Sequence, residues 1–286
     1  MTLQQALRHN AAWLATALDL TPHVARLEAQ VLLCHALHQP RAWLIAHDRD
    51  ALDGVRAQAY SALLERRLAG EPIAYILGER EFFGLNFKVT PAVLIPRPET
   101  ELLVELALAH LPENRAARVL DLGAGSGAVA IAIAKHRPPA DVVALDVSAA
   151  ALEIAQENAR RLMAANMRFL LSSWFDALPA HERFDIIVSN PPYIAANDPH
   201  LRQGDLRFEP SAALASGKDG LDDLRTIVAG APARLAPGGR LLFEHGYDQA
   251  ERCRELLRQA GFAEISSSAD LAGIERVTQG RLPGLE

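Results

Sequence analysis

The C-terminal two thirds of the chain alternate between short apolar runs and helical patterns, and this alternation constrains the fold most. Such alternation is typical of an α/β fold, in which a parallel, Rossmann-like sheet is covered by helices on both faces. Two later runs are expected to pair antiparallel, which brings the predicted strands to seven. The runs are 118–122, 142–145, 167–171, 184–189, 240–243, 262–267 and 275–279. Helices are expected between them, including one over 221–235 that ends at Pro237-Gly238-Gly239.

The first part of the chain has a different pattern. Residues 1–78 are expected to form a small all-helical domain, in which Thr21-Pro22 supplies a helix cap followed by proline at the first helical position. The inner face of that second helix is predicted to carry Leu27, Val31 and Cys34. Residues 79–95 read as a hairpin linker, and residues 96–286 as the α/β domain.

The composition of the chain argues against several classes of function. The net charge of -6 argues against a broad electrostatic grip on nucleic acid, so no direct nucleic-acid partner is expected. The two cysteines, Cys34 and Cys253, have no disulfide or zinc spacing, and no apolar stretch is long enough to span a bilayer. We therefore expect a cytoplasmic monomer without a metal ion or a membrane contact.

The loop after the first predicted strand is rich in glycine. Gly123, Gly125 and Gly127 would let the backbone turn sharply and approach a nucleotide closely. Asp146 ends the second strand, where an acidic residue commonly binds ribose hydroxyls. These residues suit an NAD-dependent oxidoreductase as well as other nucleotide-binding enzymes.

Two features favour a different cofactor. Asp121 lies at the end of the first strand, where its carboxylate would repel a pyrophosphate and attract the ammonium and sulfonium groups of S-adenosyl-L-methionine. The fourth strand runs into Asn190-Pro191-Pro192-Tyr193, whose prolines stiffen the backbone beyond the strand. An amide oxygen and a carbonyl beside an aromatic ring would suit a planar group that carries NH2.

Asn-Pro-Pro-Tyr after a strand resembles the motif of methyltransferases that act on amino or amide nitrogens. The motif alone leaves adenine in DNA, adenine in RNA and a glutamine side chain open. Other segments resemble the bacterial release factor glutamine methyltransferases, the PrmC/HemK family, in the family's order along the chain. They are 71–75, 94–101, 121–127, 189–193, 204–210, 244–246 and 275–277.

This resemblance implies a class I methyltransferase domain of seven strands behind a helical domain. It further implies methyl transfer from S-adenosyl-L-methionine to the glutamine of the Gly-Gly-Gln motif of class I release factors. The implied cofactor residues are Asp121, Gly123, Ala124, Gly125, Ser126, Gly127, Asp146, Trp174 and Asn190. The implied substrate residues are Asn190, Pro191, Pro192 and Tyr193, of which Asn190 and Pro191 would be catalytic.

Three points stay open at this stage. The family usually has an acidic residue before the tryptophan, where this chain has Ser173, so a hydrogen bond to the adenine amino group would be either weaker or made through water. The segment Pro96-Arg97-Pro98 could be a linker or a lid. The helical domain is expected to dock the protein substrate, although a packing role would fit its composition equally well.

Overall fold

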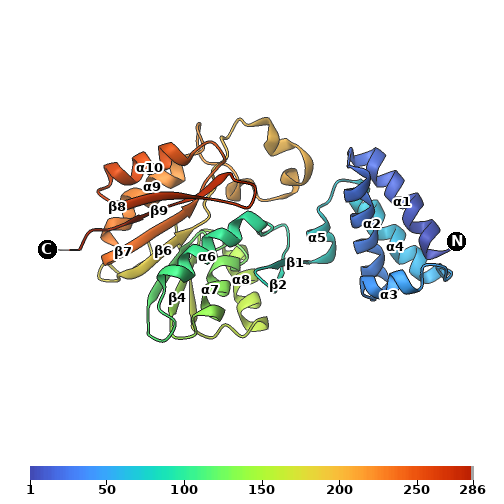
Figure 1. Ribbon diagram of the computed structural model, residues 1–286, viewed down its shortest axis with the longest axis horizontal. Helices are drawn as coiled ribbons and strands as arrows, with labels where there is room; N and C mark the ends of the chain where they lie inside the picture. Colours follow the sequence, from blue (N-terminus) through green and yellow to red (C-terminus); the bar gives the residue numbers. More distant parts are fainter. Residues whose placement is uncertain (285–286) are drawn as a thin grey trace. The chain divides into compact units, whose positions relative to one another are not determined.

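The computed structural model describes residues 1–284. The chain divides into two compact units, Met1–Gly78 and Glu79–Glu286. The first unit is all-helical, and Figure 1 draws its helices in colours that run from dark blue to teal. They are α1 (Leu3–Leu18), α2 (Pro22–Leu37), α3 (Arg41–Ala46), α4 (Gly54–Leu68) and α5 (Ile73–Leu77).

The helical unit has its own hydrophobic core. Its second helix begins with the cap that the sequence predicts. Thr21 accepts from the Val24 amide and Pro22 begins α2, as predicted. The predicted inner face of α2 was wrong at Leu27, which is 43% exposed, whereas Cys34 is partly buried and packs against the core of this unit. The face of α2 that is buried carries Ala25, Ala29, Gln30, Leu32, Leu33 and Leu37 instead.

The second unit begins with a hairpin of β1 (Glu79–Phe82) and β2 (Leu85–Lys88). Phe82 and Phe87 are fully buried in the core of this unit. Asn158 on the helix α8 (Ala149–Arg161) bonds to both the amide and the carbonyl of Lys88. The hairpin is therefore part of the sheet domain's packing.

The main sheet has seven strands in the order β5-β4-β3-β6-β7-β9-β8. The five strands from β5 to β7 pair in parallel, and β9 and β8 pair antiparallel. The strands are β3 (Arg118–Leu122), β4 (Asp141–Asp146), β5 (Met167–Leu171), β6 (Phe184–Ser189), β7 (Leu235–Glu244), β8 (Ala263–Ala269) and β9 (Glu275–Arg281). This confirms the predicted seven-stranded Rossmann-like sheet.

Helices cover both faces of the sheet (Figure 1). One buried cluster lies under α6 (Glu101–His110), α7 (Ala128–His136) and α8, and the other lies under α9 (Asp222–Gly230) and α10 (Ala250–Gln259). Short 3-10 turns are η1 (Pro98–Thr100), η2 (Pro199–Arg202), η3 (Gly204–Phe208), η4 (Ser211–Ala213) and η5 (Ala231–Ala233). Among the described residues, no helix combines the length and apolar character needed to cross a membrane.

The helix predicted over 221–235 is shorter than expected. It ends at Gly230, because Pro232 lacks an amide hydrogen and the chain continues as the short turn η5. Strand β7 then begins at Leu235, so Pro237-Gly238-Gly239 lies inside a strand instead of before one. The register of β7 against β6 shifts between Phe184 and Ile186, next to this stretch.

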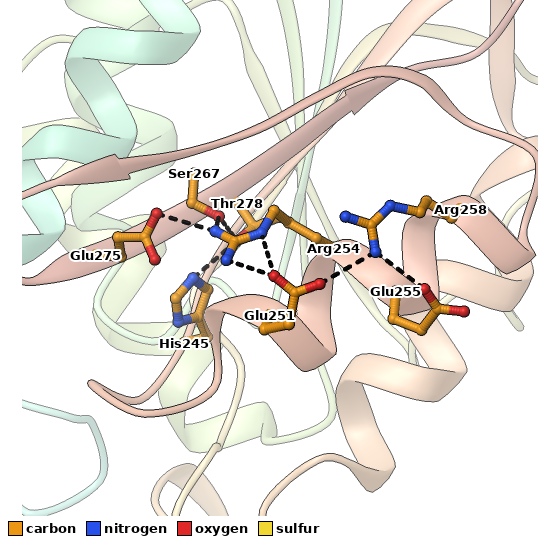
Figure 2. A network of polar contacts seen from close by, with 8 residues as sticks. All are labelled: His245, Glu251, Arg254, Glu255, Arg258, Ser267, Glu275 and Thr278. Carbon is orange, nitrogen blue, oxygen red and sulfur yellow. Dashed lines mark hydrogen bonds and ion pairs between the residues drawn. The ribbon is translucent and has the colours of Figure 1, made fainter.

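The antiparallel edge is held to α10 by a polar network (Figure 2). Arg254 on α10 donates to Ser267 on β8 at 2.8 Å and to Glu275 on β9 at 2.9 Å. Ser267 in turn bonds to Thr278, whose hydroxyl contacts Nε2 of the buried His245 at 2.8 Å. This network fixes the chain directly after β7.

Candidate active site

The carboxyl ends of β3 and β6 meet at the point where the strand order reverses. Leu122 pairs with Ser189 at the end of these two strands. The Ser189 hydroxyl also donates to the Leu122 carbonyl at 2.7 Å. Open α/β sheets bind their ligands at this switch point. The sheet thus brings the glycine-rich loop and the Asn-Pro-Pro-Tyr loop side by side.

A cavity of about 400 Å³ opens there. Its lining includes nine of the predicted site residues, namely Asp121, Gly123, Ala124, Gly125, Ser126, Asp146, Trp174, Asn190 and Pro192. Gly127, Pro191 and Tyr193 are outside this lining. The sheet therefore gathers most of the predicted cofactor residues around one cavity, together with two of the four predicted substrate residues.

Asp121 is the most unusual group in the cavity. Its side chain is 2% exposed, and Oδ2 has no hydrogen-bond partner among the described residues. Burial, with a smaller contribution from the nearby charge of Asp146, raises the pKa of Asp121 to about 7. A buried carboxylate oxygen without a partner is costly, and a cationic ligand group in the cavity would supply the missing partner of Oδ2.

The glycine-rich loop is held against β4 by Asp146. Its carboxylate accepts from the amides of Gly125 and Ser148, each at 2.8 Å. Each carboxylate oxygen keeps a further lone pair for a hydroxyl of a ligand. The next residue, Val147, is 70% exposed and lines the same cavity, so it offers an apolar surface beside the polar one.

Trp174 lines the cavity beside Gly123. A Cβ at Gly123, which has φ +77°, would lie 3.6 Å from the Trp174 ring. The Ser172 hydroxyl bonds to the Trp174 carbonyl and to the Ala177 amide, which fixes the turn. Trp174 also packs against the core, so it is a core residue as well as part of the cavity lining. Ser173 is exposed and lines the cavity.

Asn190 presents its amide to the cavity. Its Nδ2 donates to the Thr100 hydroxyl at 3.1 Å, and no donor in the described part of the chain is bonded to Oδ1. The oxygen is therefore available to accept from a substrate. Tyr193 points elsewhere, because its hydroxyl donates to Glu244 at 3.1 Å and Gln249 donates to its carbonyl at 2.9 Å.

The sequence reasoning gave no role to two buried residues here. Thr100 is 4% exposed and lines the cavity, and Glu244 is 1% exposed at the end of β7. Burial raises the pKa of Glu244 to about 7 despite the hydrogen bond from Tyr193, and Glu244 Oε2 has no hydrogen-bond partner among the described residues. A glutamate directly after the apolar run Leu241-Leu242-Phe243 was the available signal.

Comparison with known proteins places this site in a family. Residues 99–206 match the methyltransferase small domain, and residues 5–78 match the PrmC N-terminal domain. A release factor glutamine methyltransferase of Bordetella pertussis is 57% identical over 91% of this chain and 96% of its own length. The chain belongs to the release factor glutamine methyltransferase family. A member from Burkholderia pseudomallei is 56% identical over 90% of this chain and 92% of its own length.

The fold of this family member also resembles a solved RNA methyltransferase. The T. thermophilus 16S rRNA guanosine N2-methyltransferase, in complex with AdoMet and guanosine, matches with a TM-score of 0.54 and 25% identity. The match covers 71% of this chain and 49% of that one. It leaves unmatched about half of that RNA enzyme and more than a quarter of this chain.

Proposed function

We propose that this chain transfers a methyl group from S-adenosyl-L-methionine to the side-chain amide nitrogen of the glutamine in the Gly-Gly-Gln motif of class I peptide chain release factors. Membership of the family supports this reaction. The observation that carries the proposal is Asn190, whose Nδ2 is bound to Thr100 beside the cavity. Its Oδ1 is thereby left to accept an N–H from a planar amide.

The residues of the cavity fit S-adenosyl-L-methionine. Bound there, the cofactor supplies an electrophilic methyl group on a sulfonium. The unpartnered Oδ2 of Asp121 suits the cationic end of the molecule, and Asp146 suits the ribose hydroxyls. Val147 and Trp174 provide the apolar walls that an adenine ring requires. The carboxylate of Asp121 disfavours a pyrophosphate, which speaks against an NAD-dependent oxidoreductase.

The proposed reaction depends mainly on how the substrate amide nitrogen is positioned relative to the methyl group. A carboxamide nitrogen is a poor nucleophile, because its lone pair is delocalised into the carbonyl. In our proposal, Asn190 Oδ1 and the Pro191 carbonyl each accept one N–H, which orients the nitrogen and increases its electron density. Holding two reactants in this way can supply roughly 7–11 kcal/mol of the barrier. The amide proton can leave to water after transfer, so no dedicated base is required.

The partner is proposed to be the release factor itself, bound by a monomeric enzyme in the cytoplasm without nucleic acid. The net charge of -6 supports the absence of a duplex-binding face. We also propose that the helical unit, which matches the PrmC N-terminal domain, docks the release factor.

The test uses labelled S-adenosyl-L-methionine with a release factor or with unmethylated DNA, followed by mass spectrometry. A mass gain of one methyl on the Gly-Gly-Gln peptide is expected. A release factor with alanine in place of that glutamine is the matched control and should stay unlabelled. Label on N6 of adenine, with the release factor untouched, would contradict the proposal.

A further inference from the structure

Gln249 holds the last residue of the Asn-Pro-Pro-Tyr loop. It lies directly before α10 and is 6% exposed. Its Nε2 donates to the Tyr193 carbonyl at 2.9 Å, and its Oε1 accepts from the Gly246 amide at 2.8 Å. Gln249 is outside the lining of the cavity. A buried side chain that does not line the cavity thus connects the loop to the turn after β7.

The two partners of Gln249 allow only one orientation of its amide. A carbonyl oxygen only accepts hydrogen bonds and a backbone N–H only donates them. Nε2 must therefore face Tyr193 and Oε1 must face Gly246, which is the orientation observed. Both polar groups of the side chain are thus used, one for the loop and one for the turn.

The contact between Gln249 and Tyr193 is closely packed against Gly220. Gly220 has φ +76°, and a Cβ there would clash with the Tyr193 carbonyl oxygen and would lie 2.7 Å from Gln249 Nε2. A larger residue at this position would have to displace one of the two groups. The close packing therefore leaves the Tyr193 carbonyl little freedom to move.

The turn that contains Gly246 is itself fixed. The Gly246 carbonyl accepts from Nδ1 of the fully buried His245 at 2.9 Å, and Nε2 of His245 bonds to Thr278 on β9 at 2.8 Å (Figure 2). Thr278 belongs to the network that ties β8 and β9 to α10. Gln249 therefore links the loop to a firmly held part of the sheet domain.

The loop depends on such contacts because two of its four residues are proline. Pro191 and Pro192 have no amide hydrogen, so neither can donate a hydrogen bond to the rest of the protein. In the proposed function, the Pro191 carbonyl is moreover reserved for the substrate. The carbonyl of Tyr193 is therefore well suited to hold the far end of the loop in place.

We propose that Gln249 is a positioning residue for methyl transfer. Through the Tyr193 carbonyl, it keeps the loop where its two acceptors, Asn190 Oδ1 and the Pro191 carbonyl, face the substrate amide. The inference rests on the proposed function, which assigns these two acceptors to the substrate. A displaced loop would hold the amide nitrogen in the wrong place relative to the methyl group, which lowers the rate of transfer.

The experiment uses two substitutions that separate the two hydrogen bonds of Gln249. In an alkaline buffer that keeps the glutamate ionised, Gln249→Glu retains an acceptor for the Gly246 amide but places an oxygen against the Tyr193 carbonyl. Gln249→Met removes both bonds at similar size. Gln259→Met is the matched control, because Gln259 lies at the other end of α10 and donates to the exposed Glu255 at 2.9 Å. The measurements are kcat and KM for release factor methylation, the affinity for S-adenosylhomocysteine by calorimetry, and the melting temperature.

Both Gln249 variants should lower kcat at least about 10-fold, because a misplaced reacting group has a large effect on rate. KM and the affinity for S-adenosylhomocysteine should stay within about threefold of wild type, since Gln249 does not line the cavity. Gln259→Met should retain kcat within about twofold. If the melting temperature shows that a Gln249 variant is unfolded, Gly220→Ala replaces it, because the added methyl group displaces the same contact.

A loss of kcat smaller than about 10-fold in either Gln249 variant would overturn the inference. A nearly normal Gln249→Glu beside a slow Gln249→Met would show that Gln249 acts only on the turn at Gly246. An equal loss of affinity for S-adenosylhomocysteine would indicate general damage to the fold, which also contradicts a positioning role. Failure of the proposed function looks different, because wild-type enzyme would then leave the release factor unmethylated.

Discussion

Arg97 forms an ion pair with Glu209, whose side chain is completely buried. The second oxygen of Glu209 accepts from the Ile95 amide at 3.1 Å. The pair thus joins two loops that lie more than a hundred residues apart in sequence. Both loops contribute to the cavity, through Pro96 and Pro210. Pro96 is therefore part of the cavity wall, and Arg97 ties its segment to the loop that contains Glu209 and Pro210.

Removal of Arg97 should destabilise the protein. Burial raises the pKa of Glu209 even beside the guanidinium, so without Arg97 the carboxylate would lose its main compensation. Arg97→Ala is expected to cost about 1–3 kcal/mol in the free energy of unfolding, since a buried acceptor loses its partner. Urea denaturation measures this value. Arg258→Ala is the control, because its partners are exposed and its expected cost is about 0–1 kcal/mol. Equal losses would contradict the argument.

Binding of S-adenosylhomocysteine should depend on pH through Asp121. Because burial raises the pKa of Asp121 to about 7, the free enzyme holds a proton there at lower pH. A cationic ligand favours the carboxylate, so binding below about pH 7 must release that proton, and affinity should fall as the pH is lowered. Calorimetry in two buffers of different ionisation enthalpy counts the protons. Asp121→Asn should bind weakly with no proton release. Unchanged proton release in that variant would exclude Asp121 as the source.

Asp121 also makes the stability of the ligand-free enzyme depend on pH. Lowering the pH should increase this stability, whereas it should decrease the affinity for the ligand. The pKa of Asp121 is raised from 3.8 in the unfolded chain to about 7 in the folded one. The folded state therefore binds an extra proton between these values. Asp121 therefore contributes to the free energy of unfolding of the ligand-free enzyme. This stabilisation is fully present below pH 3.8 and is lost as the pH rises through about 7.

Asp146 should govern cofactor affinity more than stability. Its carboxylate anchors the amides of Gly125 and Ser148 and is proposed to bind the ribose. Hydrogen bonds to charged groups contribute about 1.5–3 kcal/mol each, so Asp146→Ala should weaken S-adenosylhomocysteine at least about 10-fold. Asp141→Ala, at the other end of β4, is the matched control and should bind normally. Binding of NADH in place of S-adenosylhomocysteine by wild-type enzyme would refute the assignment.

Deletion of Met1–Gly78 tests the docking role proposed for the helical unit. The cut must precede the hairpin, because Phe82 and Phe87 are buried in the core of the second unit. The shortened chain should bind S-adenosylhomocysteine normally, since every residue that lines the cavity belongs to that unit. It should methylate a release factor poorly. Full activity would leave the helical unit with a stabilising role alone.

Local patterns in the sequence predicted the parts of the site that depend on strand ends. Asp121, Asp146 and Asn190 each follow or end an apolar run, and parallel strands bring such ends to one edge of the sheet. The glycine loop was predictable for the same reason. These features need only the order of strands along the chain and the residues beside them.

Features that depend on distant contacts could not be read in this way. Thr100 and Asn190 form a hydrogen bond although they lie 90 residues apart in the sequence. The periodicity of apolar residues cannot predict such a contact. The inner face of α2 was misjudged at Leu27, because burial depends on which helices cover α2. Tyr193 was expected to face the substrate, whereas the structure ties its hydroxyl to Glu244. Its proposed contact with the substrate remains a prediction.

The central claim is that Asn190 holds the substrate amide for methyl transfer. The most direct measurement is the single-turnover rate of release factor methylation by wild type and Asn190→Ala, together with their affinities for S-adenosylhomocysteine. We predict that the rate falls more than about 10-fold while the affinity changes less than about threefold, because Asn190 acts on the substrate. An Asn190→Ala enzyme that keeps more than about a tenth of the wild-type rate would contradict the account.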